Sequence, residues 1–296
     1  MKSTKNVYEI ITERITDKLK KGCVPWHRPW KGGIQGIPQN AVSGHRYSGL
    51  NVWLLSCQGY DSNQWLTYNQ MRKFPGAWII ATEKPTPVIF WKWFEKEDAE
   101  EQGEKVKIPC LRYYYVWNVS QIGGLPDKFD HVEEQILSNV FTPMEEAEKI
   151  VTGYQNKPTI KHQGERAFYV SLDDSITMPK KERFESSEEY FSTLFHECIH
   201  STGNEKRLNR KGISETHYFG DSVYSQEELC AEMGSAYLCG IAGIENKTID
   251  NSAAYINGWL QRLQNNPKWL VQAAAQAQKA ADYIQNKSYE GDKEEK

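Results

Sequence analysis

The chain has 296 residues, of which 39% are apolar and 25% are charged, and its mean hydropathy is −0.70. This composition excludes wholesale disorder and collagen-like repeats. The longest uninterrupted apolar stretches, Ala77–Ala81 and Val88–Trp91, are far shorter than the roughly 20 residues of a membrane-spanning helix, and the N-terminus has no apolar signal core. We therefore expect a soluble protein of the cytoplasm without a membrane partner.

The net charge of −3 hides an uneven distribution along the chain. Residues 1–92 carry 13 Lys and Arg against 5 Asp and Glu, whereas the remaining residues carry 23 against 34. Eight of the ten tryptophans fall within the first 117 residues. A basic, Trp-rich front half joined to an acidic back half indicates two domains with different partners. The six cysteines show no paired spacing, which argues against a disulfide scaffold or a thiolate zinc site.

The front half opens with an amphipathic helical pattern over residues 6–21, which Gly22 should end. Prolines and glycines then predict a loop over residues 25–33. Between Tyr47 and Tyr68 the spacing favours a helix followed by a Gly-Tyr-Asp-Ser turn. Aromatic and β-branched runs predict strands at 78–81, 88–94 and 112–119, with a solvated hairpin loop over 95–107.

A break in the pattern over residues 125–142 predicts the domain boundary. We expect an α+β protein with domains over residues 1–130 and 140–286, and a charged tail over 287–296. Ser186 and Glu189 form a capping box at the start of a helix that runs from about Ser187 to Gly203. The other back-half elements are expected to be a helix at 144–155, paired strands within 167–178, and helices at 226–239, 253–263 and 267–284.

The helix from Ser187 contains an HExxH motif, His196-Glu-Cys-Ile-His200. Positions four apart share one face of a helix, so both imidazoles can bind one Zn²⁺, while Glu197 reaches the water on the metal. Zinc lowers the pKa of that water toward about 7, and Glu197 is the candidate general base that takes its proton. Another divalent ion such as Mn²⁺ is an alternative.

A catalytic zinc needs a third protein ligand, and three candidates follow the motif. The segment from Ser225 to Met233 resembles the gluzincin metallopeptidases, in which a helix after HExxH bears two acids one turn apart. That resemblance implies Glu228 as the ligand and Glu232 as an acid that orients a histidine. Ser225 with Glu228 also fits a capping box, which would make Glu232 the ligand, and His217 is a third choice. Tyr218 and Tyr224 are candidates to stabilise an oxyanion.

The front half has the side chains expected of a single-strand binder, in which bases stack on aromatic rings and cations follow the phosphates. The alternative is that many of these rings form the core of the domain. The candidate DNA-binding residues are Trp26, His27, Arg28, Trp30, Lys31, Arg46, Tyr47, Trp65, Tyr68, Arg72 and Lys73.

Five segments in order resemble the ArdC-type antirestriction proteins, which are plasmid-encoded and share their N-terminal region with a conjugative plasmid primase. They begin at Val24 (VPWHRPW), Asn40 (N…YSGLN), Trp65 (WLTYNQ), Tyr115 (YVWNVSQ) and Phe195 (FHECIHSTG…RL). The resemblance implies an N-terminal single-stranded-DNA-binding domain and a C-terminal zincin-like metallopeptidase domain. It also implies protection of incoming plasmid DNA from host restriction during conjugation.

Two other functions remain open at this point. The chain could be a DNA-directed metalloprotease that cleaves host proteins on single strands. It could instead be a pure single-strand binder in which the metal only holds the fold together.

Overall fold

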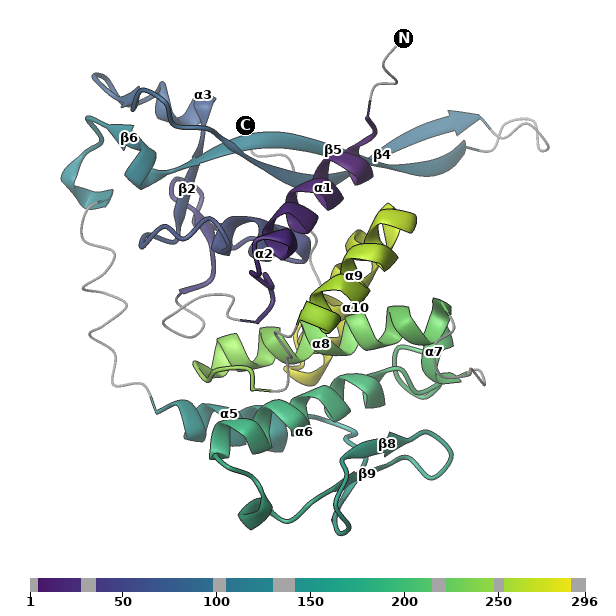
Figure 1. Ribbon diagram of the computed structural model, residues 1–296. Helices are drawn as coiled ribbons and strands as arrows, with labels where there is room; N and C mark the ends of the chain where they lie inside the picture. The colour runs from purple at the N-terminus through teal and green to yellow at the C-terminus, as the bar shows by residue number, and fades with distance from the viewer. Residues whose placement is uncertain are drawn as a thin grey trace.

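Figure 1 presents a computed structural model that describes residues 5–27, 36–97, 105–129, 142–214, 222–247 and 253–288. The protein is of the α+β class, as the sequence predicts, with two larger sheets and a group of packed helices. The predicted domain boundary lies largely within residues 130–141, and most of the predicted charged tail lies beyond Ser288, outside the described residues. Within the described residues, no helix has the length and apolarity to cross a membrane.

The front half is built on a four-stranded sheet with the strand order β1-β2-β5-β4. The first pair is parallel and the others are antiparallel, and β4 and β5 form a long hairpin that projects past the helices (Figure 1). The strands are β1 (Gln39–Asn40), β2 (Gln64–Thr67), β4 (Thr86–Glu97) and β5 (Lys105–Asn118), and the helices of this part are α1 (Val7–Lys20) and α2 (Leu50–Ser56).

Two sequence predictions for the front half need adjustment. The helix expected after Tyr47 is observed as α2, and Gly59 of the predicted turn takes a left-handed conformation (φ 81°). The strand β2, which the sequence did not predict, follows before Tyr68. The strands of the hairpin also continue into the expected 95–107 loop, up to Glu97 and again from Lys105. The helix over 6–21 is confirmed as α1, whose N-cap is Asn6.

A small unit lies at the outer end of the front half. It consists of α3 (Tyr68–Met71) and a two-stranded ribbon formed by β3 (Trp78–Ile79) and β6 (Ile122–Gly123). Side chains from all three elements belong to one hydrophobic cluster, so they form a single packed unit.

In the back half, helices pack against one another and against a small sheet. The helix α6 packs against α8, which in turn packs against α10. The three-stranded sheet has the order β7-β9-β8 and lies beside α6 (Figure 1). The elements are α5 (Pro143–Gly153), β7 (Thr159–His162), β8 (Phe168–Val170), β9 (Ser175–Met178), α6 (Ser187–Thr202), α7 (Lys211–Ser214), α8 (Ser222–Ala242), α9 (Ala253–Asn265) and α10 (Pro267–Ile284).

The two halves share one hydrophobic core, since α1 packs against α9 and α10, and α2 packs against α10. Polar contacts also cross between the halves: Thr12 Oγ1 donates to the carbonyl of Pro267 at 2.9 Å, and the amide of Gly49 donates to Gln278 at 3.1 Å. The Trp53 and Tyr237 rings lie 4.4 Å apart between centroids. The last helix therefore completes the packing of the first segment of the chain.

Candidate metal centre

The helix α6 brings the two histidines of the HExxH motif together. Ser186 caps the helix by accepting a hydrogen bond from the amide of Glu189, and eleven of the sixteen helical residues are buried. The Nε2 atoms of His196 and His200 face each other at 3.0 Å. The regular helix therefore holds both imidazoles on one side, as their four-residue spacing predicts.

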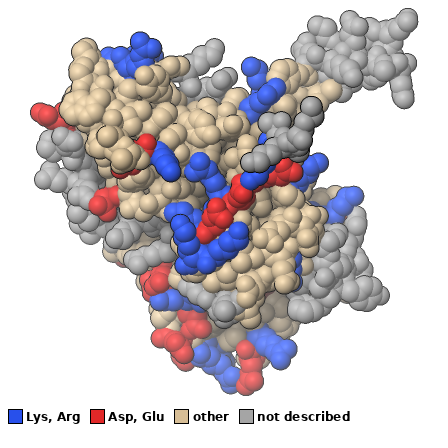
Figure 2. All heavy atoms as spheres, turned by 45° about the horizontal axis from the view of Figure 1, so that its top comes forward, with Lys and Arg blue, Asp and Glu red and all other residues tan. Residues whose placement is uncertain are grey.

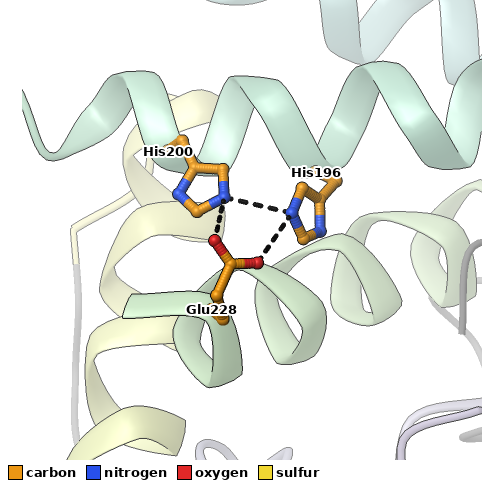
Figure 3. Close-up of side chains that lie close together, drawn as sticks. All are labelled: His196, His200 and Glu228. Carbon is orange, nitrogen blue, oxygen red and sulfur yellow. Dashed lines mark hydrogen bonds and ion pairs between the residues drawn. The ribbon is translucent and has the colours of Figure 1, made fainter. Parts of the chain in front are cut away.

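The neighbouring helix α8 adds a carboxylate to this pair (Figure 3). The Glu228 oxygens lie 3.6 Å from His196 Nε2 and 3.6 Å from His200 Nε2. Ligand atoms of the three residues all lie within 4.8 Å of one another. Two imidazole nitrogens and a carboxylate oxygen form a donor set that suits Zn²⁺ or Mn²⁺, so the residues present fit a divalent ion.

The geometry distinguishes among the three candidates for the third donor. Glu228 lies against the histidine pair, while His217 falls outside the described residues, as does Tyr218. The capping-box alternative is wrong, because α8 begins at Ser222 and Ser225 therefore lies inside the helix. The backbone of Tyr224 lies in the first turn of α8, and its side chain is outside the description.

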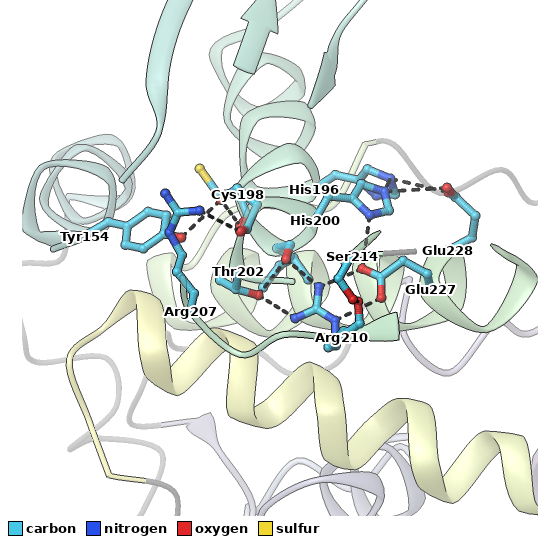
Figure 4. A network of polar contacts seen from close by, with 12 residues as sticks. Tyr154, His196, Cys198, His200, Thr202, Arg207, Arg210, Ser214, Glu227 and Glu228 are labelled. Carbon is cyan, nitrogen blue, oxygen red and sulfur yellow. Dashed lines mark hydrogen bonds and ion pairs between the residues drawn. The ribbon is translucent and has the colours of Figure 1, made fainter. Parts of the chain in front are cut away.

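A buried charge network holds the outer nitrogen of His200 (Figure 4). His200 Nδ1 lies 3.3 Å from Glu227 Oε1. Arg210 donates to both oxygens of Glu227, at 2.6 and 2.9 Å, and also to Thr202 Oγ1 and the carbonyl of Ile199. Because Nδ1 faces Glu227, Nε2 is left to face the cluster. A carboxylate that binds a histidine in this way fixes the orientation of the ring.

The pKa values in this network follow from its charges. Burial alone would lower the pKa of His200, but the hydrogen bond to Glu227 and the charges of Glu228 and Glu197 outweigh it and raise the pKa to about 9. Burial alone would raise the pKa of Glu227, but Arg210 holds it below its ordinary value. The predicted base Glu197 lies on α6 between the histidines and is only 7% exposed.

The role predicted for Glu232 needs a correction. Its carboxylate accepts hydrogen bonds from Tyr255 Oη at 2.5 Å and from Trp26 Nε1 at 3.2 Å, and the acid that faces the outer nitrogen of His200 is Glu227. Burial raises the pKa of Glu232 to about 7. Sequence reasoning missed Glu227 and Arg210, although Glu227 directly precedes the predicted ligand.

The structure separates the predicted DNA-binding residues into two groups. Trp26, Tyr47 and Trp65 are at most 2% exposed, so the prediction that they stack on bases is wrong. Trp26 is covered because Glu232 and Tyr255 of the back half bind its N–H, whereas Trp65 and Tyr47 pack together with Val88 and Val116. Of the others, His27 is partly buried, Arg46, Tyr68, Arg72 and Lys73 are exposed, and Arg28, Trp30 and Lys31 lie outside the described residues.

Two family models match separate parts of the chain. Residues 5–117 match the N-terminal domain of the anti-restriction factor ArdC, and residues 145–276 match a zincin-like metallopeptidase. The second match contains the donor set formed by α6 and α8.

Relatives known from sequence match almost the whole chain. Two proteins of Escherichia coli called DNA primase TraC are 35% and 36% identical to it over 96% and 95% of its length. The chain spans only 20% and 27% of these relatives. The protein y4eC of Sinorhizobium fredii is 28% identical over 94% of this chain and 91% of its own.

Solved structures extend the match to the fold. A metal-free crystal structure of the antirestriction protein ArdC from plasmid R388 has a TM-score of 0.73 and 32% identity, and the match covers 96% of this chain and 100% of the other. A Mn(II)-bound structure of the same protein has a TM-score of 0.74 and 31% identity, with 95% and 98% coverage.

Proposed function

The chain belongs to the ArdC family of antirestriction proteins, and on that premise we propose that it binds single-stranded DNA and protects incoming plasmid DNA from host restriction during conjugation. The observation that carries the proposal is the match to R388 ArdC, which runs through both halves and leaves no part of that chain uncovered. The likeness of the same residues to primases supports single-stranded DNA as the ligand, since a primase acts on single strands. We place this activity in the cytoplasm.

We further propose that His196, His200 and Glu228 hold a divalent ion, either Zn²⁺ or Mn²⁺. When bound there, such an ion supplies Lewis-acid chemistry, which polarises a carbonyl and makes water more acidic. The pairing of Glu227 with Arg210 keeps His200 Nδ1 occupied and its Nε2 directed at the site. In this proposal Glu197 is the general base, whose carboxylate would accept a proton from water during hydrolysis of a peptide bond.

A second candidate function is cleavage of a host protein bound to single-stranded DNA. It is favoured by the converging donor set with a buried carboxylate, Glu197, beside it, because a purely structural metal site has no need of a base. A third candidate function is that of a pure single-strand binder in which the ion only stabilises the fold. Chelation would then lower the melting temperature and leave every activity of the still-folded protein unchanged.

Binding titrations with labelled oligonucleotides test the proposed function. We expect tighter binding to a single strand than to a duplex of the same length, little dependence on sequence, and a steep loss of affinity between about 50 and 200 mM salt. Equal affinity for duplex and single strand would contradict the proposal. Measuring the cleavage of protein substrates with and without the oligonucleotide separates the binding protein from the DNA-directed protease.

A further inference from the structure

The indole of Trp78 is exposed although its position is fixed by the backbone beneath it. Trp78 lies on β3 opposite Gly123 of β6, and 58% of its surface is open to solvent. A Cβ added at Gly123 would lie 2.5 Å from the indole atom Cζ2, and one added at Gly124 would lie 2.7 Å from Cζ3. The ring therefore rests directly on two glycines, in a place that a side chain at either position would take.

The packed unit that carries this ring also carries exposed cations and a second exposed ring. Met71 of α3 packs in the same cluster as Ile79 and Ile122, so α3 and the β3–β6 ribbon are one unit. On the outside of this unit, Tyr68 is 47% exposed, and Arg72 and Lys73 are also exposed.

Few carboxylates belong to the chain segments that form this surface: Glu83 and Asp127 lie at its borders, and Glu83 accepts a hydrogen bond from Gln121 Nε2 at 2.8 Å. The sequence has no Asp or Glu from Gln64 to Thr82 and none from Val119 to Pro126. Figure 2 shows blue side chains at the upper left of the molecule, beside a broad surface of uncharged residues, with red side chains lower at the left edge. A fixed ring, with cations on the same packed unit, is the combination that binds single-stranded nucleic acid.

The other exposed aromatic surface has a different charge environment. On the β4–β5 hairpin, Trp93 is 61% exposed, and the ring of Phe94 already has Lys92 and Arg112 within 5.7 and 5.6 Å of its centroid. The sequence that follows, residues 95–107, has six Asp and Glu against three Lys. This acidic run would repel phosphates, so the hairpin is the poorer site for a nucleic acid.

We propose that Trp78 is a stacking platform for a base of single-stranded DNA, with Tyr68 as a second ring and with Arg72 and Lys73 beside the phosphates. This inference rests on the proposed single-strand binding and adds where the strand lies. It assigns the site to the small unit of α3, β3 and β6, away from the segment that contains Trp26.

Titrations of a fluorescein-labelled oligo-dT by anisotropy test the proposal on the full chain. Trp78→Leu keeps an apolar side chain but removes the ring face, and we expect the affinity to fall about ten- to one-hundredfold. Trp93→Leu is the matched control, because it removes an equally exposed indole, and its affinity should stay within about twofold of wild type. Trp78→Phe should recover most of the loss.

The salt dependence separates the cations from the ring. Replacing Arg72 and Lys73 together by Gln should reduce the slope of log affinity against log salt, whereas Trp78→Leu should leave that slope unchanged. Melting temperatures near wild type identify the variants that are folded, and Trp78→Phe remains a test of the ring if Trp78→Leu is not.

The outcomes bear on two separate statements. If the wild-type protein does not bind the oligonucleotide, the proposed function fails. If the wild-type protein binds and Trp78→Leu binds equally well, or if Trp93→Leu causes the larger loss, DNA binding stands and the platform at Trp78 is overturned.

Discussion

The two halves of the molecule place their candidate functional side chains in opposite settings. In the back half, His200 and Glu227 are buried between long helices, and each polar group has a partner in the structure. In the front half, Trp78 lies on a strand of two residues and Arg72 directly follows a helix of four, and both side chains are exposed. Buried polar groups require specific partners, whereas exposed groups only require a surface. Removing one partner of a buried ion pair in the back half should therefore cost stability, whereas changes to the exposed side chains of the front half should cost binding alone.

The largest effect is expected when Glu197 is replaced. Glu197→Gln keeps the size of the side chain but removes a base, so any peptide hydrolysis should fall by about 10²- to 10⁴-fold. Metal content, melting temperature and affinity for single strands should stay near wild type. Cleavage assays and metal analysis of the same preparation measure both.

Plasmid transfer into a restricting host shows whether that chemistry matters for protection. We expect Glu197→Gln to protect the incoming plasmid as wild type does, because coating of a single strand needs only the front half. A variant that retains metal and DNA binding but no longer protects would point to the protease function instead.

The next largest effect is a loss of stability when Arg210 is replaced. Arg210→Met leaves the carboxylate of Glu227 buried without its cation, and we expect a loss of about 3–5 kcal/mol in the free energy of unfolding. Arg183→Met is the matched control, because its ion pair with Glu165 is exposed on both sides and should contribute less than about 1 kcal/mol. Denaturant titrations measure both, and similar losses for the two variants would contradict the contrast between buried and exposed groups.

A smaller effect is expected from pH in the metal-free protein. The pKa of His200 is about 9 in the fold, above the 6.5 of an unperturbed histidine, so its proton stabilises the fold below pH 6.5 and that stabilisation is lost as the pH rises through 9. The free energy of unfolding should fall by about 2–3 kcal/mol over this range. Titrations in chelator should give a flatter profile for His200→Asn, and an equally steep profile would remove His200 as the cause.

The smallest effect is expected at Trp26, a front-half residue that is buried like the candidate metal centre of the back half. Trp26→Phe removes the N–H that binds Glu232 and should cost about 1–2 kcal/mol, with no change in affinity for single strands. Trp93→Phe, on an exposed indole, should change stability by less than about 0.5 kcal/mol. Weaker DNA binding by a folded Trp26→Phe would restore Trp26 as part of the nucleic-acid surface.

The contrast between buried and exposed side chains also explains which features the sequence could predict. The pairing of His196 and His200 depends only on the period of one helix. A resemblance to gluzincins favoured Glu228 as the third ligand but left Glu232 and His217 open. Arg210 could not be foreseen, because its contact with Glu227 arises from the packing of a turn against α8. The α+β class and most elements followed from periodicity and from turn residues.

Trp26 and Trp78 mark where prediction from the sequence stops. Pro and His flank Trp26 and suggested an exposed loop, yet its cover comes from residues more than 200 positions later in the chain. The pattern around Trp78 predicts a strand and does not indicate that the ring is exposed, yet 58% of its surface is open to solvent. Burial of a single aromatic side chain depends on contacts distant in sequence, and no local pattern encodes them.

The return of α10 to the front half limits how genes of this family can exchange parts. A crossover in the segment between the halves would join an α1 from one parent to an α10 from another, and contacts such as that of Thr12 with Pro267 would meet unmatched surfaces. Such hybrid proteins should fold poorly and be selected against unless both parents are close relatives. We therefore expect relatives to carry the two halves together, as the two much longer primases do, which match 96% and 95% of this chain.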